Sequence, residues 1–312
     1  MTDAARTLVV GGGGLLGSAV VRELARLGRS CRVAKVNWDG DSVADLTAEL
    51  EGFAGTGPWR IAWCAGAGVT ATTAEKFARE EQVFDVFATT LGDLCASGRL
   101  AADDGVVFLA SSAGALYAGA GAAPFSEDTP PVPRGAYGAS KLVLEERLGR
   151  LAAGGIAAVA GRFTNLYGPG QDLSKPQGLV SHLCRAHFTG APVGIYVPMD
   201  TLRDYLFVDD AASLVIDLLD RAALAGPGLT VKILASHSSV SVAALLMQAQ
   251  RVFRRPLRVL HGASSQAAQQ ARDLRVRSIV WPELDRRDLR TLPAGIWATA
   301  ADVEARLTSL RG

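Results

Sequence analysis

The sequence predicts an α/β protein built on a doubly wound parallel sheet, with a smaller, discontinuous C-terminal domain. Segments that are apolar throughout alternate with helical patterns in the first half of the chain, which is typical of parallel strands buried on both faces. The expected strands are 7–10, 31–36, 59–68, 105–112 and 155–163. After residue 167 the sequence becomes rich in turns. We therefore expect a sheet domain of 1–167 and 205–231, and a substrate-binding domain of 168–204 and 232–312.

The composition narrows the class of protein. The chain has 312 residues, of which 49% are hydrophobic and 20% charged, as in ordinary globular proteins. A net charge of +1 gives no reason to expect binding to nucleic acid or to a membrane. No apolar run approaches the length of a membrane span and the start lacks a signal-peptide pattern, so we expect a cytoplasmic protein. The four cysteines are widely spaced and are expected to be reduced.

A glycine-rich loop follows the first expected strand. The run from Gly11 to Gly17 satisfies both GxGxxG and GxxGxxG, between a strand and a helix. Such glycines let the backbone approach a pyrophosphate, which then lies on the free N–H groups of the helix N-terminus. A flexible glycine turn is the alternative. The pattern favours a Rossmann-type dinucleotide-binding domain, with cofactor contacts at Gly11, Gly14, Leu15, Leu16 and Gly17.

The end of the second expected strand bears on the choice of cofactor. In this kind of domain the residue about 20 positions after the loop meets the adenosine ribose, and a carboxylate there favours NAD. Here the strand ends at Lys35, a cation that suits the 2′-phosphate of NADP. Asp39 lies slightly beyond and is the alternative partner, for the ribose of NAD. We expect NADP or NAD, with NADP favoured.

Tyr137 and Lys141 are four residues apart at the start of an amphipathic segment. On a helix this spacing puts both side chains on one face, one turn apart. A free phenol has a pKa of about 10, and a lysine charge nearby lowers that pKa toward neutral pH. A tyrosine packed on a lysine stem is an alternative that involves no chemistry. The pair is nevertheless a candidate for proton transfer.

The glycine loop and the segment YGASK (137–141) together resemble the extended short-chain dehydrogenase/reductases. Within them the chain is most similar to the NAD(P)-dependent nucleotide-sugar epimerase/dehydratase group, typified by UDP-galactose 4-epimerase. Further segments resemble this group in the same order, so that the resemblance covers roughly residues 7 to 215. They are FLASSAGALYAG (108–119), PFSEDTPPVPRGAYGASK (124–141), GRFTNLYGPGQ (161–171) and RDYLFVDDAA (203–212).

The resemblance implies roles for individual residues. Tyr137 would be the acid/base, Lys141 would hold the nicotinamide ribose and lower the pKa of the phenol, and Ser112 would bind the sugar hydroxyl, with Ser111 as the alternative. Besides Lys35 at the strand end, the other cofactor contacts, which the resemblance implies, are Asp45, Leu46, Ala65, Gly66, Ala67, Ser111 and Phe163. The implied substrate contacts are Ser112, Asn165, Leu179, Val180 and Arg203. From the arginine-rich stretch 251–290, Arg275 is the candidate for a diphosphate, although most of its arginines are expected to form local ion pairs.

Several features depart from the family pattern. The serine strand continues as Ser-Ser-Ala-Gly without carboxylates, so 4,6-dehydration would lack its acid and base. VPMD (197–200) replaces a glycine-aspartate-glycine turn, and the last 80 residues match poorly, so the sugar cannot be read. His182 and His187 are expected to be ordinary helix residues, and no metal-binding pattern is present.

We therefore expect an NAD(P)-dependent nucleotide-sugar epimerase, whose partner is a nucleotide-activated sugar. An NADPH-dependent nucleotide-sugar 4-ketoreductase is the alternative within the family. A non-catalytic NADP-binding sensor is a further alternative, disfavoured because Ser112, Tyr137 and Lys141 are all present. The helices expected at 74–97 and 137–153 carry apolar residues beyond one narrow stripe. In the family such helices pair across a two-fold axis, which predicts a homodimer with a four-helix bundle.

Overall fold

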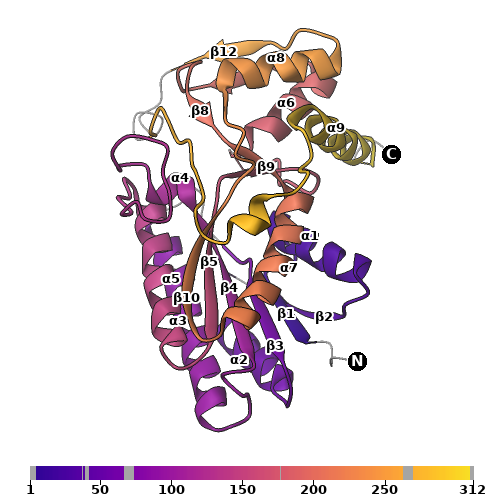
Figure 1. Cartoon of the computed structure of the whole chain (residues 1–312). Coiled ribbons are helices and arrows are strands. Elements are labelled where there is room, and N and C mark those ends of the chain that lie inside the picture. Colours follow the sequence, from indigo (N-terminus) through magenta and orange to yellow (C-terminus); the bar gives the residue numbers. More distant parts are fainter. Residues whose placement is uncertain are drawn as a thin grey trace.

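A computed structural model of the chain describes residues 5–36, 38, 42–66, 74–175, 177–262 and 270–309. Its centre is a six-stranded sheet with the strand order β10-β5-β4-β3-β1-β2, and every neighbouring pair is parallel (Figure 1). The strands are β1 (Arg6–Val10), β2 (Cys31–Ala34), β3 (Trp59–Trp63), β4 (Gly105–Ser112), β5 (Ala157–Phe163) and β10 (Gly228–Leu234). The predicted Rossmann-type doubly wound α/β fold is confirmed.

Helices cover both faces of this sheet, as the buried apolar strands require. The core on one face joins the sheet to α2 (Ser42–Phe53), α3 (Ala74–Ala96) and α5 (Ala136–Ala152). The core on the other face joins it to α1 (Leu15–Arg26) and α7 (Val208–Ala225). In Figure 1 α3 and α5 lie to the left, and α7 and α1 lie toward the right. The sequence order of the strands reverses at β1, between β2 and β3, and ligands bind at such a switch point, outside the carboxyl ends of the strands.

The sixth strand, β10, is absent from the sequence prediction. Its first residues are exposed and only its last three are buried, so no continuous apolar run marks it. Lys232 is the first of these three, and its ammonium is bonded to Asp285 and Ser278. The predicted domain boundary after residue 231 therefore falls inside a strand of the main sheet. The expected strands 31–36 and 59–68 are shorter in the structure, and end at Ala34 and Trp63.

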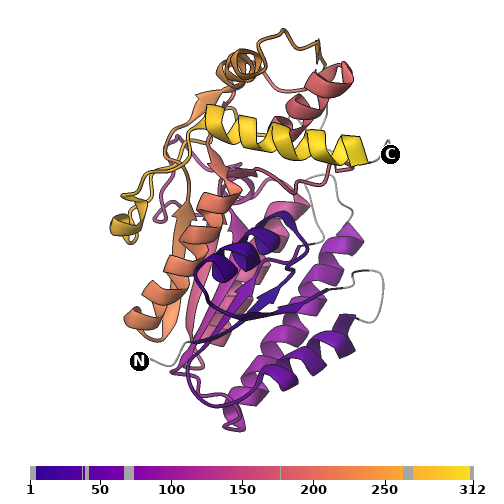
Figure 2. The same cartoon turned by 90° about the vertical axis from the view of Figure 1, so that its right-hand side faces the viewer.

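A smaller part of the chain lies above the carboxyl ends of the strands (Figures 1 and 2). It has a hydrophobic cluster of its own, formed largely by three helices that pack on one another. These helices are α6 (Leu179–Thr189), α8 (Val242–Phe253) and α9 (Leu292–Ser309). Short two-stranded sheets accompany them, made by β6 (Asn165–Tyr167) with β9 (Tyr205–Phe207), β7 (Val193–Ile195) with β12 (Val259–His261), and β8 (Leu202–Arg203) with β11 (Val240–Ser241).

The segment 270–290 descends from this smaller part onto the main sheet domain. Val276 forms a bridge with Phe125, and Trp281 and Leu284 pack against the hydrophobic core beside α7. The short helix η2 (Pro282–Asp285) lies in this segment. The smaller part is therefore discontinuous in sequence, and its segment 270–290 also packs on the sheet domain.

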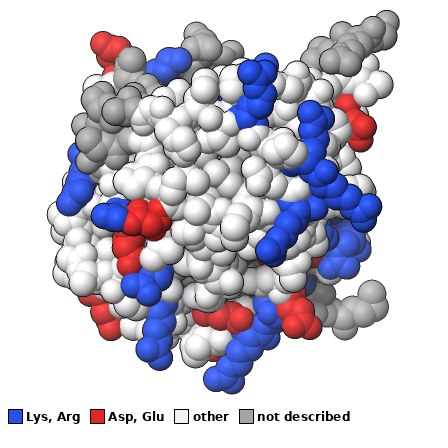
Figure 3. Space-filling view, turned by 90° about the horizontal axis from the view of Figure 1, so that it is seen from above, with Lys and Arg blue, Asp and Glu red and all other residues white. Residues whose placement is uncertain are grey.

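Charged side chains on the upper face surround a broad area of uncharged ones, with Lys and Arg prominent along one side (Figure 3). Within the described ranges, no helix is both long enough and apolar enough to cross a membrane. Cys184 is buried and the other three cysteines are half-buried, and all four are free thiols. Burial raises the pKa of the Cys64 thiol to about 12.

Candidate active site

A pocket of about 1010 Å³ lies where the carboxyl ends of the strands meet the smaller part of the chain. It brings together residues that the sequence analysis proposed from segments far apart in the chain. The predicted residues that line it are Gly14, Leu15, Leu16, Ala65, Gly66, Ser111, Ser112, Tyr137, Lys141, Phe163, Asn165, Leu179, Val180 and Arg203. The glycine loop, the Tyr–Lys helix and the expected substrate contacts thus share one pocket.

The glycine loop has the close contacts that a dinucleotide-binding loop needs. Gly11 has a φ of +85°, and a Cβ there would lie 2.6 Å from the backbone of Ala65. A Cβ on Gly17 would overlap the carbonyl oxygen of Gly11, so this glycine lets α1 pack closely on the loop. Gly14 caps α1 with extended backbone and no side-chain hydrogen bond. The first N–H groups of α1 are therefore available to the phosphates of a dinucleotide, whose pyrophosphate this loop fits.

Several predicted cofactor contacts lie away from the pocket lining. Gly11 and Gly17 shape the loop from behind, as described above. Lys35 is exposed directly after β2, and Asp45 is exposed in the first turn of α2. Leu46 is fully buried in the core beneath α2. Ala67 and Asp39 lie outside the described residues.

Tyr137 and Lys141 lie in the first turns of α5, as their spacing predicts. The Lys141 ammonium is 5.8 Å from the centroid of the Tyr137 ring. Lys141 is buried, and its Nζ donates a 2.8 Å hydrogen bond to Oε1 of Glu80 on α3. Burial by itself would lower the pKa of Lys141, but the Glu80 carboxylate and Tyr137 outweigh it and raise that pKa. The lysine therefore stays charged beside the phenol at neutral pH.

The two serines at the end of β4 have different partners. Ser111 is 5% exposed, and its Oγ donates a 2.5 Å hydrogen bond to Oε1 of Glu145. Ser112 is half-buried, and its Oγ accepts a 3.3 Å bond from the backbone N–H of Ala115, which caps α4 (Ala113–Leu116). Because an accepting hydroxyl keeps its own proton free to donate, Ser112 can still bind a ligand. The geometry favours Ser112 over Ser111 as the serine that meets a substrate.

A buried polar network lies directly beneath these serines. Arg162 on β5 donates to both carboxylate oxygens of Glu145 on α5, with a shortest distance of 2.6 Å. Arg162 also donates a 2.7 Å bond to the hydroxyl of Tyr117, which in turn donates to the carbonyl of Ser126. Burial would lower the pKa of Arg162, but the hydrogen bonds and charge of Glu145 raise it. The network joins α5 to the ends of β4 and β5.

Arg203 is a buried cation at the other end of the pocket. It is 7% exposed, and its guanidinium donates to the carbonyl of Leu202 at 2.8 Å and to Oε1 of Gln270 at 3.3 Å. Burial lowers its pKa. Among the described residues no carboxylate lies within ion-pair distance of it. A buried guanidinium paired only with neutral oxygens is suited to binding an anion that enters the pocket.

The pocket lining as a whole carries an excess of positive charge. Five cationic side chains line it, against a single carboxylate, that of Asp172, in the part of the chain that the structure describes. The cations are Arg134, Lys141, Lys175, Arg185 and Arg203. Lys141 is already paired with Glu80, which leaves the charge excess toward the smaller part of the chain. The pocket is therefore suited to a ligand with negative charge.

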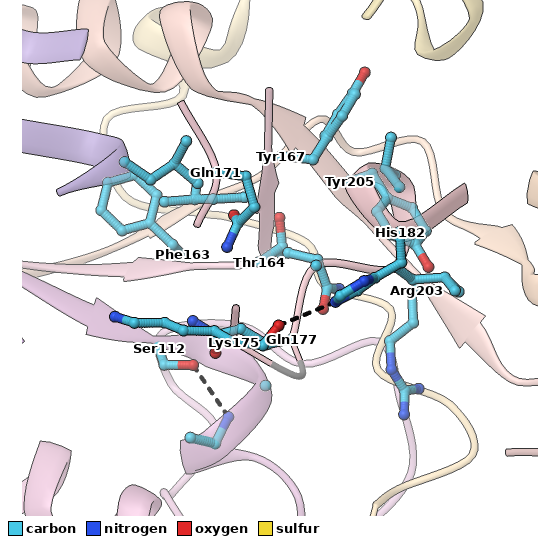
Figure 4. A pocket seen from close by; sticks show the side chains of 18 of the residues that line it. Ser112, Phe163, Thr164, Tyr167, Gln171, Lys175, Gln177, His182, Arg203 and Tyr205 are labelled. Carbon is cyan, nitrogen blue, oxygen red and sulfur yellow. Dashed lines mark hydrogen bonds between the residues drawn. The ribbon is translucent and has the colours of Figure 1, made fainter. Parts of the chain in front are cut away.

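Sequence reasoning missed several polar residues of this pocket. Figure 4 shows the side chains of Thr164, Tyr167, Gln171, Lys175, Gln177, His182 and Tyr205 around it. His182, expected to be an ordinary helix residue, lines the pocket and shares a 3.0 Å hydrogen bond with the carbonyl of Lys175. No motif marks Lys175, although lysine is rare in this sequence, with 5 residues against 27 arginines. Glu80 gave no signal, because a glutamate in a long helical pattern is normally a surface residue.

Arg275 does not line this pocket. Its guanidinium forms a 2.8 Å ion pair with Asp273, and it lines a separate, smaller hollow with His237 and Asp285. Other arginines of the stretch 251–290 also form ion pairs, as expected: Arg272 with Asp200, Arg287 with Asp217 and Arg290 with Asp209. His187 stacks on Phe253 with ring centroids 4.4 Å apart, as an ordinary helix residue. The described residues contain no cluster of His, Cys, Asp and Glu suited to a metal ion.

Comparison with known proteins places this site in a family. Residues 7–233 match the NAD dependent epimerase/dehydratase family, which covers the loop, the sheet and the Tyr–Lys helix. The chain therefore belongs to this family of NAD-dependent enzymes, within the extended short-chain dehydrogenase/reductases, and the predicted membership is confirmed.

Individual relatives support the same assignment. Over 245 residues the chain is 30% identical to a UDP-glucose 4-epimerase of Mycolicibacterium smegmatis, a match that covers 70% of this chain and 72% of that enzyme. A second match, to dTDP-4-dehydro-6-deoxyglucose reductase of Escherichia coli, is 32% identical over 106 residues. It spans 33% of each chain.

Solved structures share the fold over nearly the whole chain. A UDP-glucose 4-epimerase of Thermotoga maritima with UDP-glucose superposes with a TM-score of 0.80 and 20% identity, covering 97% of this chain and 99% of the other. MoeE5 in complex with UDP-glucuronic acid and NAD gives a TM-score of 0.78 and 24% identity, covering 97% and 100%. At these identities the likeness shows the fold.

The buried network beneath the serines predicts that replacing Arg162 lowers the free energy of unfolding much more than replacing a surface arginine does. Arg162→Met leaves the buried Glu145 carboxylate without its cation, so we expect unfolding in urea to show a loss of about 3–5 kcal/mol. Arg26→Met is the matched control, because its pair with Glu23 is at the surface, with the arginine side chain 67% exposed. This change is expected to cost less than about 1 kcal/mol. Similar losses in the two variants would show that the network does not support the fold.

Proposed function

We propose that this chain is an NAD(P)-dependent nucleotide-sugar epimerase that acts at a secondary alcohol of the sugar. The observation that carries the proposal is the single pocket lined by the glycine loop, by Ser112, Tyr137 and Lys141, and by the buried Arg203. The loop supplies the site for a dinucleotide, the Tyr–Lys pair supplies proton transfer, and the arginine supplies a site for an anionic substrate.

The residues of this chain divide the chemistry among them. When bound, the nicotinamide cofactor would supply the hydride chemistry at the sugar carbon, as acceptor and then as donor. The α1 N-terminus and the glycine loop bind its pyrophosphate, and Phe163 lies at the end of β5 where the nicotinamide is expected. Lys141, charged and buried beside the phenol, favours the phenolate of Tyr137. Tyr137 then takes the proton of the sugar hydroxyl and later gives it back, while Ser112 donates a hydrogen bond to the same oxygen.

The proposal of an anionic substrate depends on the positive charge of the pocket lining. A nucleotide sugar carries a diphosphate, and the pocket lining has an excess of cations toward the smaller part of the chain. Arg203 is the best placed of these for the diphosphate, because it is buried and is bonded only to neutral oxygens among the described residues. Asn165, Leu179 and Val180 line the same region and are proposed as further substrate contacts.

A 4-ketoreductase that consumes NADPH is the second candidate. Two observations favour it: the partial match to a reductase of a keto-sugar nucleotide, and Lys35 exposed at the end of β2. Epimerisation is preferred because the match to the 4-epimerase covers more than twice as much of the chain. A 4,6-dehydratase is disfavoured, because the serine strand ends without carboxylates.

The proposed cofactor is NADP rather than NAD. This choice depends on Lys35 alone, and tighter binding of NAD to the purified protein would reverse it.

The proposed assembly is a homodimer through a four-helix bundle. It is supported by α3 and α5, which pack side by side at one side of the sheet. Light scattering at micromolar concentration tests it, and a monomer would contradict it. The cytoplasm is the proposed location.

The reaction type is tested by supplying UDP-, GDP-, CDP- and dTDP-sugars with only a catalytic amount of cofactor. An epimerase converts one of them to its epimer without net change in the absorbance of reduced nicotinamide. Tyr137→Phe is expected to bind cofactor normally and to lower turnover by about 10²–10⁴-fold, because it lacks the proton-transfer group. A keto-sugar that oxidises NADPH in equal amount, with no epimer formed without it, would establish the ketoreductase instead.

Substitution of two arginines tests whether the diphosphate site is at Arg203 rather than at a surface ion pair. With UDP as the probe, Arg203→Met is expected to weaken binding at least about tenfold, or about 1.4 kcal/mol, in titration calorimetry. Arg275→Met is the control, because Arg275 is paired with Asp273 and lies outside the pocket. We expect it to bind UDP as the unchanged protein does. Equal weakening in both variants, or an effect confined to Arg275, would refute the assignment of Arg203.

A further inference from the structure

The Lys141–Glu80 pair is a buried ion pair at the edge of the pocket. The Lys141 and Glu80 side chains are 7% and 1% exposed, and Nζ and Oε1 are 2.8 Å apart. A Cβ added to Gly66, at the pocket edge after β3, would lie 3.6 Å from Oε1 of Glu80 and 3.7 Å from Nζ of Lys141. The pair therefore sits against the backbone at the end of β3, where the core meets the cofactor side of the pocket.

Stability alone does not explain a carboxylate at this position. Taking two charges out of water costs about as much as their attraction returns, so an apolar pair of similar volume would often be as stable. The pair does put a carboxylate beside the ammonium that lies 5.8 Å from the centroid of the Tyr137 ring. With Glu80 beside it, the Lys141 ammonium is held in place and part of its charge is offset.

We propose that Glu80 is a positioning residue, which holds the Lys141 ammonium at the end of β3 and sets how much of its charge acts on the Tyr137 phenol. The inference deepens the proposed function, because it concerns the same proton-transfer group. Glu80 itself need not touch substrate. It acts through Lys141 of the adjoining helix, whose ammonium is bonded to Glu80 and lies 5.8 Å from the centroid of the Tyr137 ring.

Charged groups on α5 and on the strands that contact it have partners of their own. On α5, Glu145 lies one turn further along and is bonded to Arg162 from β5 and to Ser111 from β4. On β10, Lys232 is bonded to Asp285. The short helix α4 carries no titratable side chain. Glu80 on α3 is therefore the carboxylate bonded directly to the Lys141 ammonium in the part of the chain that the structure describes.

Removing the Glu80 carboxylate is expected to make the Tyr137 phenolate easier to form. Glu80→Gln takes away the negative charge that offsets Lys141, so that the Tyr137 phenolate becomes the nearest anion available to a buried ammonium. Phenolate formation is then favoured. The lost charge is bonded at 2.8 Å to the ammonium that lies 5.8 Å from the centroid of the Tyr137 ring, so we expect the tyrosinate signal of Tyr137 at lower pH.

The test is a pH titration of tyrosinate absorbance in the near ultraviolet, with saturating NAD. The signal of Tyr137 is obtained by subtracting the same titration of a Tyr137→Phe version of each protein. Glu81→Gln is the matched control, because Glu81 is the next residue of α3 and pairs with Arg147 instead, at 3.8 Å. We expect a shift to lower pH in Glu80→Gln and none in Glu81→Gln. No shift in Glu80→Gln, or a shift to higher pH, would overturn the proposal.

A second variant covers the case in which Glu80→Gln does not fold. Glu80→Asp keeps the charge but withdraws it from the ammonium by one methylene, so we expect a smaller shift in the same direction. A titration at the original pH in Glu80→Asp would then overturn the proposal. The measurement needs no sugar substrate. Failure to turn over any nucleotide sugar would therefore count against the proposed function and leave this test intact.

Discussion

Glu145 and Arg162 form an ion pair at the carboxyl end of the sheet, in the interior of the protein, where α5 crosses β4 and β5. Glu145 is one turn beyond Lys141 on α5, and also accepts the hydrogen bond of Ser111 on β4. One carboxylate thus fixes three elements relative to one another. The Tyr–Lys pair and the serine strand lie in the same pocket because of where α5 sits on the sheet.

The Glu145–Arg162 pair favours one position of α5 on the sheet more than it adds to the overall stability. A buried ion pair adds little net stability, because desolvation consumes most of the attraction. Either charge left alone is costly, however, so competing positions of α5 that separate Glu145 from Arg162 are disfavoured. The Lys141–Glu80 pair has the same property between α5 and α3. The two pairs thus tie α5, which carries Tyr137, to α3 on one side and to β5 on the other.

The glycine loop is the second constraint on the site, because its glycines have no side chains to hold neighbouring backbone apart. Gly11 and Gly17 allow the loop, α1 and the end of β3 to approach more closely than any other residue would allow. This brings the N–H groups of α1 to the point where the strand order reverses. At the opposite end of the pocket, Arg203 is buried without a carboxylate among the described residues, and the lining is rich in cations. The pocket therefore has groups suited to binding an anion at each end, and Tyr137 and Lys141 belong to the same lining.

The sequence by itself determined the local elements and the family. The apolar runs marked five of the six strands of the main sheet, the loop spacing marked the dinucleotide site, and the spacing of Tyr137 and Lys141 put both on one helical face. These features are encoded by neighbouring residues, so periodicity and motif spacing reveal them. The sequence pattern did not predict β10, because its buried part is short and contains Lys232, whose partner Asp285 is 53 residues away.

Only the tertiary structure decided what depends on contacts between distant segments. Glu80 looks like a surface glutamate in its own helix, and only the packing of α3 on α5 brings it to Lys141. The two serines are indistinguishable in sequence until Glu145 bonds one and α4 is capped by the other. Likewise, Arg203 and Arg275 differ because the fold buries the first in the pocket and pairs the second with Asp273 outside it. Burial and charge pairing are properties of the folded chain, and the sequence pattern around each residue does not contain them.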